Sequence, residues 1–358
     1  MNTLNSPKKR VLFISPSLSK GGAETQLLKI AKFLNAHDFE VMIISLKPIN
    51  EFETDFSKMG IRIAYLKSWF GRPAHNWMQL KKLIRDFRPE HVVAFMFIAI
   101  LFARMLKMSL DFKLISSIRT SVIHRKWYLP YKLSIGMDDA LVFNSKASRD
   151  NFERLKLAKK GGLVIHNAIS IPDLSTISCR PRAVFTWVCL AHFRWNKDYV
   201  TLFEAIALLK PGTFRLEIIG ELNEETWPHR MILDLGIQNY VRILGFKQNT
   251  SEYLKAADAF VLSSHYEGMP NAILEAMAHG KPVVVTAIDC NKEFIEAANC
   301  GMLSEPLNAR SLADQMKKMM DMSPTGRYVL GQNGKKYIET HFSEQQTLNQ
   351  WMELIVNT

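Results

Sequence analysis

The chain has 358 residues, of which 47% are hydrophobic and 22% are charged, and this composition excludes an intrinsically disordered protein. Its length suggests two domains, each large enough to bury a core of its own. There are 46 Lys and Arg residues against 34 Asp and Glu residues, a net charge of +12. This excess indicates an anionic partner, which could be a nucleic acid, an anionic lipid or a phosphorylated small molecule.

Apolar runs of strand length alternate with amphipathic runs of helix length along the whole chain, a pattern typical of βαβ units around mostly parallel sheets. In the first half we expect strands at 11–15, 41–45, 61–65, 92–97, 113–118, 140–143 and 163–166, with a long helix over 23–35. In the second half we expect strands at 184–190, 216–219, 241–244, 259–262 and 283–286, and a final amphipathic helix over 343–356.

Three features bear on the cellular compartment. The four cysteines form no CxxC pair, which argues against a zinc site and favours a reducing environment. The basic N-terminus lacks a signal-peptide core, so we expect a cytoplasmic protein. The most apolar stretch, 92–103, is shorter than the roughly 20 residues that span a bilayer and is predicted to be a buried strand running into a helix.

A change of composition marks the middle of the chain. Segment 169–182 contains prolines and serines without periodicity and is predicted to link two domains. Residues 1–178 hold 28 Lys and Arg against 14 Asp and Glu, whereas residues 179–358 hold 18 against 20. The whole positive excess therefore lies in the first half, which points to an anionic surface or acceptor there.

The segment 265–286, HYEGMPNAILEAMAHGKPVVVT, predicts a strand end, a tight turn, a short helix and another strand. Such a helix N-terminus, at the carboxyl end of a parallel sheet, is a favourable place for a phosphate. Glu267 lies before the turn and Glu275 one helical turn after Asn271, so both carboxylates could face one crevice. Alternatively, Glu267 caps the helix and Glu275 is merely solvated.

Glu267 and Glu275 enclose seven residues, and with EGMPNAILEAMAHGKPVV this segment resembles the E-x7-E signature of retaining glycosyltransferases of the GT-B fold, family 4. The resemblance extends over nearly the whole chain through SLSKGGAETQLLKIAKFL, VFNSKAS, VIHNAI and LAHFRWNKDYVTLFEAI. It implies two Rossmann-like, doubly wound α/β domains that face a cleft. Their expected bounds are 1–172 for the acceptor side and 173–342 for the nucleotide-sugar side, with a helix at 343–358 that crosses back to the first domain.

The resemblance also implies roles for particular residues in binding a nucleoside-diphosphate sugar. Glu275 matches the glutamate that binds the ribose hydroxyls, Glu267 the one near the transferred sugar, and Lys197 the lysine that neutralises the diphosphate. The remaining matches are backbone positions expected to approach the diphosphate or the sugar, namely Gly268, Met269, Pro270, Asn271, Gly21 and Gly22.

The chain departs from the family pattern at three places. His192 occupies a position where relatives commonly carry Arg, so either Arg194 or His192 is expected to reach the phosphate. Many relatives place a His after an N-domain strand, where this chain has Arg119, and we expect Arg119 near the catalytic centre with His124 as the lesser candidate. Asp289 and Cys290 stand where a Gly-Gly pair is usual, so the donor sugar cannot be assumed from relatives.

The resemblance implies a hexosyltransferase that moves a sugar, with UDP as the favoured nucleotide, to a hydroxyl of a glycan or lipid-linked acceptor with retention. It implies a front-face route without a metal or other cofactor, in an envelope polysaccharide or lipopolysaccharide pathway. We expect the basic N-domain to dock on the inner face of the cytoplasmic membrane and expect no nucleic-acid partner. A non-hydrolysing sugar-nucleotide epimerase and an inactive nucleotide-sugar-binding subunit of a synthase are the alternatives.

Overall fold

The computed structural model of the chain describes residues 8–19, 21–52, 55–67, 73–120, 122–172, 184–222, 224 and 226–358. It divides into two compact units: unit 1 consists of Met1–Ala168 and Gln345–Thr358, and unit 2 of Ile169–Glu344. The sequence placed the boundaries at 172 and 342. Most of the predicted linker, 173–182, lies outside the described residues. Counted over these units, unit 1 has a net charge of +14 and unit 2 of −2.

Unit 1 is built on a parallel sheet of seven strands in the order β3-β2-β1-β4-β5-β6-β7. The strands are β1 Lys9–Ser15, β2 Phe39–Ser45, β3 Arg62–Tyr65, β4 His91–Phe95, β5 Lys113–Ile118, β6 Ala140–Phe143 and β7 Leu163–Val164. Their side chains alternate between two buried clusters, one on each face of the sheet. Both faces are therefore covered, as parallel sheets require.

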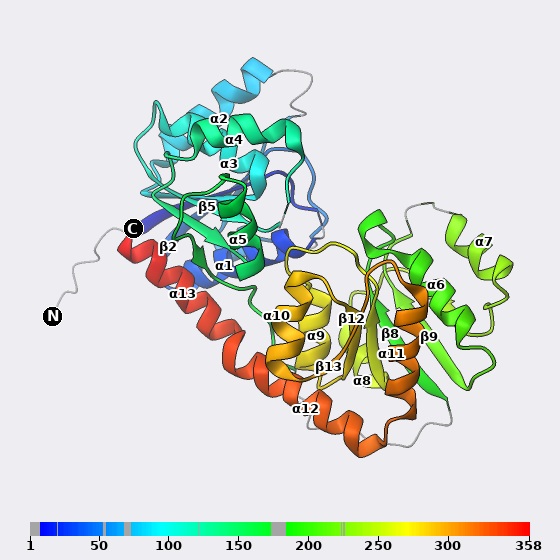
Figure 1. Cartoon of the computed structure of the whole chain (residues 1–358). Coiled ribbons are helices and arrows are strands. Elements are labelled where there is room, and N and C mark those ends of the chain that lie inside the picture. Colours follow the sequence, from blue (N-terminus) through cyan, green and yellow to red (C-terminus); the bar gives the residue numbers. More distant parts are fainter. Residues whose placement is uncertain are drawn as a thin grey trace. The chain divides into compact units, whose positions relative to one another are not determined.

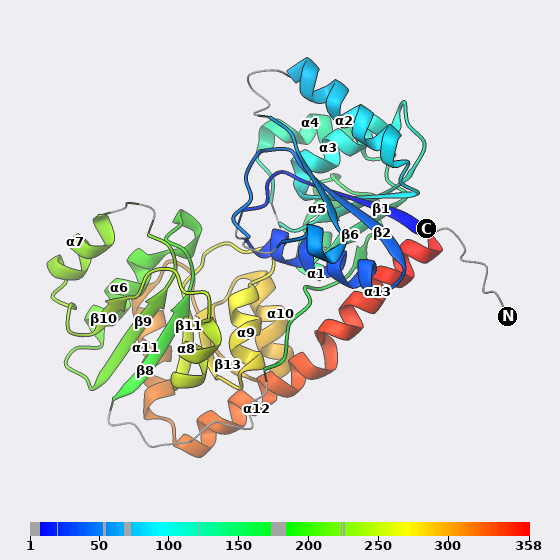
Figure 2. The same cartoon turned by 180° about the vertical axis from the view of Figure 1, so that it is seen from behind.

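The helices of unit 1 form a layer on each face of this sheet (Figures 1 and 2). One layer contains α2 Pro73–Phe87, α3 Met96–Lys107, α4 Tyr128–Ser134 and α5 Lys146–Arg154. The other contains α1 Gly22–Ala36 and α13 Glu344–Asn357. Helix α13 buries Leu348, Trp351 and Ile355 in the core beside α1, so residues from the far end of the chain complete unit 1.

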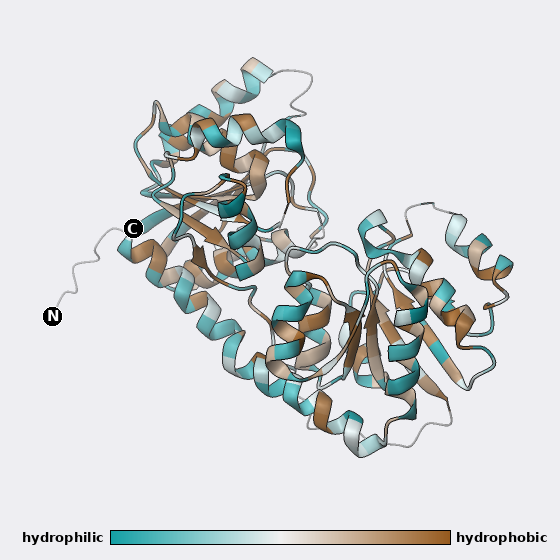
Figure 3. Cartoon of the chain, viewed as in Figure 1, coloured by the Kyte–Doolittle hydropathy of each residue, from teal (hydrophilic) through white to brown (hydrophobic). Residues whose placement is uncertain are grey.

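Unit 2 has a parallel sheet of six strands in the order β10-β9-β8-β11-β12-β13. The strands are β8 Phe185–Leu190, β9 Phe214–Ile219, β10 Val241–Ile243, β11 Ala259–Leu262, β12 Val283–Thr286 and β13 Gly301–Ser304. Its α-helices are α6 Tyr199–Leu208, α7 Trp227–Asp234, α8 Thr250–Ala256, α9 Asn271–Ala278, α10 Asp289–Ala298, α11 Ala309–Asp321 and α12 Pro324–His341. Figure 3 shows the hydrophobic strands at the centre of each unit and hydrophilic residues along the outer helices.

Most predicted strands match the structure within two residues, and two differences have clear causes. The predicted strand 92–97 ends at Phe95, because Met96 adopts a φ of 67° and begins α3. Strand β13 was not predicted, since its sequence GMLS begins with Gly and lacks β-branched residues. Its Gly301 is required by close packing, because a Cβ there would lie 2.1 Å from the Val283 carbonyl oxygen.

No helix in the described part of the chain combines the length and the apolarity needed to cross a membrane. The apolar segment 92–103 forms β4 and most of α3, both inside unit 1.

Candidate functional site

The candidate site lies where the strand order of unit 2 reverses. After the central strand β8 the chain continues through α6 to β9, which pairs with one edge of β8. The later strand β11 pairs with the opposite edge of β8. In open parallel sheets, ligands bind in the crevice outside the carboxyl ends of the strands at such a reversal. The segments that follow β8 and β11 are therefore expected to form a ligand site.

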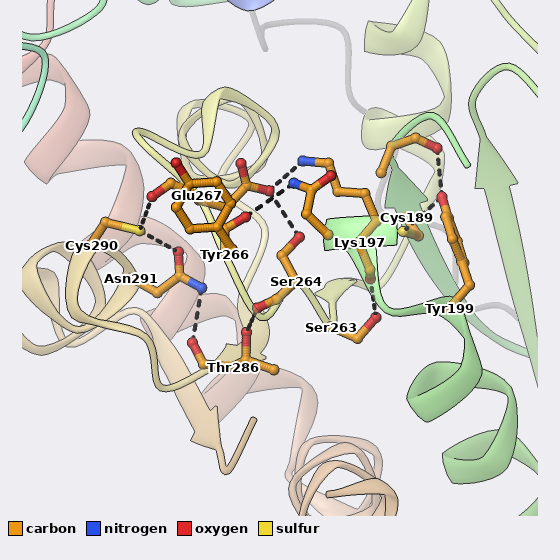
Figure 4. Close-up of polar contacts among 12 residues, drawn as sticks. Cys189, Lys197, Tyr199, Ser263, Ser264, Tyr266, Glu267, Thr286, Cys290 and Asn291 are labelled. Carbon is orange, nitrogen blue, oxygen red and sulfur yellow. Dashed lines mark hydrogen bonds and ion pairs between the residues drawn. The ribbon is translucent and has the colours of Figure 1, made fainter. Parts of the chain in front are cut away.

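An ion pair joins these two segments: the Lys197 ammonium contacts the Glu267 carboxylate (Figure 4). Lys197 closes the short 3-10 helix Trp195–Lys197 after β8, and Glu267 precedes α9. The Ser264 hydroxyl donates to the same carboxylate oxygen, Glu267 Oε1, at 2.8 Å. With side chains only 19% and 11% exposed, Lys197 and Glu267 hold opposite charges close together in a partly desolvated place.

Main-chain hydrogen bonds hold the same two segments together. The His265 amide donates to the Asn196 carbonyl at 3.1 Å, and the Asn196 side-chain amide donates to the Tyr266 carbonyl at 3.1 Å. The Ser263 hydroxyl lies 2.8 Å from the carbonyl oxygen of Lys197. Lys197 and Glu267 are thus positioned by their backbones as well as by their mutual attraction.

The departure from the family pattern at Cys290 lies directly beneath this loop. Its thiol contacts the Glu267 carbonyl oxygen at 3.6 Å and is 3% exposed as a residue. Burial, followed by the nearby Glu267 charge, raises the pKa of the Cys290 thiol far above its ordinary value. The thiol therefore stays neutral, and its position indicates a packing role below the loop rather than nucleophilic chemistry.

Helix α9 begins at Asn271 with Pro270 in the N-cap position, where no side chain caps the helix. The Asn271 amide donates to the Met269 carbonyl at 3.0 Å, so this amide already has a partner inside the turn. Met269 is buried in the core of unit 2 and anchors the turn. Glu275 is half-buried on the second turn of the helix, and its carbonyl accepts hydrogen bonds from the amide and ring of His279.

His192 and Arg194, the two candidates for the role of the family arginine, differ in their surroundings. His192 Nδ1 lies 3.1 Å from the Glu221 amide, which donates to it, and 3.8 Å from the Glu221 carboxylate. Arg194 is exposed, and within the described residues its side chain has no hydrogen bond or ion pair. Gly220 allows this region to pack closely, because a Cβ at Gly220 would lie 1.8 Å from the Ala191 carbonyl oxygen. Arg194 is thus the more accessible of the two side chains, and the choice between them stays a prediction.

Arg119 lies at the carboxyl end of β5 in unit 1 and is 8% exposed. Its guanidinium donates to Asn167 Oδ1 at 2.9 Å and to Ser117 Oγ at 2.8 Å, and it lies over the rings of Phe95 and Trp351. Burial lowers the pKa of Arg119 to about 9, which leaves it charged at neutral pH. These contacts tie β5 to α13, so the buried Arg119 supports the core of unit 1 whatever further role it has.

The other candidates in unit 1 lie in exposed or half-buried positions. His124 is exposed, and its Nδ1 accepts a hydrogen bond from the Lys126 amide. Gly21 is the N-cap residue of α1, which begins at Gly22. A Cβ at Gly21 would lie 2.6 Å from a carboxylate oxygen of Glu24. The roles that the resemblance implies for Gly21, Gly22, Arg119 and His124 stay predictions.

Sequence reasoning did not single out three residues of the site. Ser264 and Asn196 hold Glu267 and its loop, but short polar residues next to strand ends are too common to be noticed in one sequence. Trp195 was the more visible signal: the residue is 78% exposed, and its ring lies near those of His265 and Tyr266. It places a flat apolar surface against the two residues that precede Glu267.

Two family models match the chain. The model of glycosyl transferases group 1 matches residues 182–337, and the model of glycosyltransferase family 4 matches residues 20–171.

Among curated proteins, the capsular polysaccharide biosynthesis glycosyltransferase CapH of Staphylococcus aureus is 24% identical over 332 residues, 87% of this chain and 90% of CapH. The lipopolysaccharide core biosynthesis glycosyltransferase LpsE of Rhizobium meliloti is 30% identical over 168 residues. That match spans about half of each protein, 47% of this chain and 48% of LpsE.

Solved structures share the fold over almost the full length. A glycosyltransferase from Rickettsia africae superposes with a TM-score of 0.86 at 18% identity, covering 98% of both chains. The Anabaena protein Alr3699/HepE, solved in complex with UDP and glucose, superposes with a TM-score of 0.83 at 20% identity, covering 98% of this chain and all of that one. The two Rossmann-like units therefore form the GT-B fold.

Proposed function

The chain belongs to glycosyltransferase family 4, and from this we propose that it transfers a sugar from a nucleoside-diphosphate sugar to a hydroxyl of a glycan or lipid-linked acceptor. The observation that carries the proposal is the Lys197–Glu267 pair, held at the strand-order reversal of unit 2 and next to the N-terminus of α9. The names of CapH and LpsE favour an acceptor of envelope polysaccharide or lipopolysaccharide biosynthesis.

In the proposed donor complex, cations and a helix end bind the diphosphate. Lys197 contacts it from one side and Arg194, whose side chain is exposed, approaches from solvent. Residues 268–271 lie at the N-terminus of α9, whose partial positive charge favours the same group. Glu275 binds the ribose hydroxyls, and Glu267 lies at the transferred sugar. UDP is the favoured nucleotide, as in the complexes of Alr3699/HepE.

We propose that the transfer retains the anomeric configuration and needs no metal. Negative charge grows on the departing diphosphate as the glycosidic bond breaks, and fixed cations at that place stabilise the transition state more than the ground state. Lys197 and Arg194 supply this charge, the part that a metal plays in other transferases. The leaving phosphate oxygen then takes the proton of the incoming hydroxyl on the same face of the sugar.

The test is calorimetry of the purified chain with UDP-glucose, GDP-mannose and ADP-glucose, followed by NMR of the product formed with a membrane extract as acceptor. We expect a UDP-sugar to bind most tightly and the product to have the anomeric configuration of the donor, with turnover that EDTA leaves unchanged. Absence of binding by all three donors would refute the proposed function. Binding without turnover would instead fit an inactive subunit. Release of UDP from the donor alone, through an elimination, would fit an epimerase.

We further propose that the protein works at the inner face of the cytoplasmic membrane. The support is the charge of unit 1, +14 against −2 for unit 2, since cytoplasmic leaflets carry anionic lipids. A lipid-linked acceptor would be presented at such a surface.

A further inference from the structure

Two leucines on α4 of unit 1 stand out because they are exposed on the same side of one short helix. Leu129 and Leu133 are four residues apart, which places them on one face, and they are 66% and 78% exposed. An exposed leucine is ordinary, but two adjacent ones contribute nothing to the stability of a seven-residue helix in water. Their exposure therefore indicates a binding partner for this face of α4.

The opposite face of α4 is fixed to the body of unit 1. Tyr131 is fully buried, and the guanidinium of Arg104, from α3, lies 4.4 Å from the centroid of its ring. Arg104 also donates to Ser134 Oγ at 3.0 Å and is paired with Asp138 at 2.5 Å, both side chains being almost fully buried. Since this buried network holds α4 by one face, the helix cannot rotate to hide Leu129 and Leu133.

Cations lie close to the two exposed leucines in the sequence. Residues 120–137 contain Arg125, Lys126 and Lys132 and no Asp or Glu. All three are exposed, and within the described residues none of them forms an ion pair with a carboxylate. Trp127 is half-buried just before α4, with the Lys126 ammonium 5.6 Å from the centroid of its ring. Segments that lie in a membrane interface typically combine leucines, an aromatic residue and unpaired cations within about ten residues. This segment has that composition.

We propose that residues 125–133, the docking segment, bind an anionic lipid surface, with Leu129 and Leu133 inserted at the boundary of headgroups and acyl chains. This inference specifies the membrane partner of the proposed function and rests on it for its biological purpose. The cations favour lipid over a second copy of the chain, because two docking segments face to face would repel each other. The leucines favour lipid over a soluble polyanion, which would gain nothing from apolar side chains.

The docking segment needs a rigid base to work in this way. Binding is stronger when the inserted residues are already ordered in water, because no conformational entropy is then lost on contact. The Arg104 network supplies that base: it anchors the segment from below while the two leucines stay outside.

Vesicle flotation with the full chain tests the proposal. We expect recovery on vesicles of phosphatidylcholine with phosphatidylglycerol, little recovery on phosphatidylcholine alone, and weakening by salt. The double variants Leu129→Ser/Leu133→Ser and Lys126→Gln/Lys132→Gln should each lower the partition coefficient at least about tenfold. Leu233→Ser, on α7 of unit 2, is the matched control, because Leu233 is 64% exposed on a helix outside the docking segment.

Equal recovery on both kinds of vesicle would overturn the proposal, as would full binding by the Leu129/Leu133 variant or an equal loss in the Leu233 control. A wild-type dimer in light scattering that the leucine substitutions convert to monomers would also overturn it, in favour of a self-association face. UDP-glucose calorimetry on the same samples checks folding and keeps the proposals separate. Flotation without donor binding refutes the proposed function alone, and donor binding without flotation refutes the docking segment alone.

Discussion

The substitution Lys197→Ala tests the proposed donor site most directly. It removes the cation that is paired with Glu267 at the carboxyl end of the sheet in unit 2, where the two side chains are 19% and 11% exposed. Because Lys197 ends a short 3-10 helix at the surface of the unit, its loss leaves the buried core unchanged. We expect weaker binding of the nucleotide without a change of fold.

The magnitude follows from two opposing contributions. A charge-assisted hydrogen bond to a phosphate contributes about 1.5–3 kcal/mol, which corresponds to roughly a ten- to 150-fold change in Kd. In the free protein, however, Lys197 is already paired with Glu267. A partly exposed pair contributes on the order of 1 kcal/mol, and a diphosphate must weaken it. The net loss in Lys197→Ala should therefore be about 0.5–2 kcal/mol, which corresponds to roughly a two- to thirtyfold rise in Kd.

Calorimetry with UDP-glucose and with UDP alone measures this effect. Lys317→Ala is the matched control, because Lys317 is also paired, with Asp321 at 2.7 Å, but on the exposed side of α11. Glu267→Gln provides a second comparison: it frees Lys197, so UDP should bind at least as tightly as to the wild type, while sugar transfer falls. An unchanged Kd in Lys197→Ala, or an equal loss in Lys317→Ala, would refute the assignment.

Three further predictions concern the ribose contact, a buried ion pair and pH. Glu275→Ala should raise the Kd for UDP-glucose at least about tenfold while leaving the melting temperature unchanged, and tight binding in calorimetry would contradict the ribose role. Asp138→Asn should lower the free energy of unfolding of unit 1 by about 3–5 kcal/mol in urea titrations, because it leaves the fully buried Arg104 without its carboxylate. Asp86→Asn, which breaks an exposed pair on α2, should cost less than about 0.5 kcal/mol, and equal losses in the two variants would refute this reasoning. Burial lowers the pKa of His279 below its ordinary 6.5, so the unfolded chain takes up the proton first as pH falls, and stability is lost below about pH 6.5. His279→Gln should therefore lose less stability than the wild type between about pH 7.5 and 5.5, and parallel losses would contradict the assignment.

The strands were largely predictable because long parallel strands buried on both faces are written as continuous apolar runs. Strand β13 was not predicted because its four residues GMLS carry too little apolar signal. It is recognisable only from its pairing with β12. The buried Arg104 was likewise invisible, since it follows an apolar run and reads as the polar end of a helix. Its partner Asp138 is 34 residues further along the chain, and only the fold brings the two together.

The candidate site divides in the same way. Lys197, Glu267 and Glu275 could be proposed because each stands in a recognisable motif. That Lys197 and Glu267 contact each other could not, because the two lie 70 residues apart and meet only where β8 and β11 become neighbours. The packing of Cys290 under the Glu267 loop was hidden for the same reason, and the substitution of a usual glycine there became understandable only with its contact in view.

The contribution of α13 to unit 1 has a consequence for biosynthesis and for engineering. Trp351 is fully buried against Phe95, with ring centroids 6.0 Å apart, yet the ribosome adds it only after the whole of unit 2. During translation the sheet face that α13 covers therefore lacks this helix, although the first 168 residues of unit 1 have already been synthesised. A chimera that combines unit 1 of one relative with unit 2 of another consequently needs two junctions, one near each boundary of unit 2, so that α13 stays with the sheet it covers.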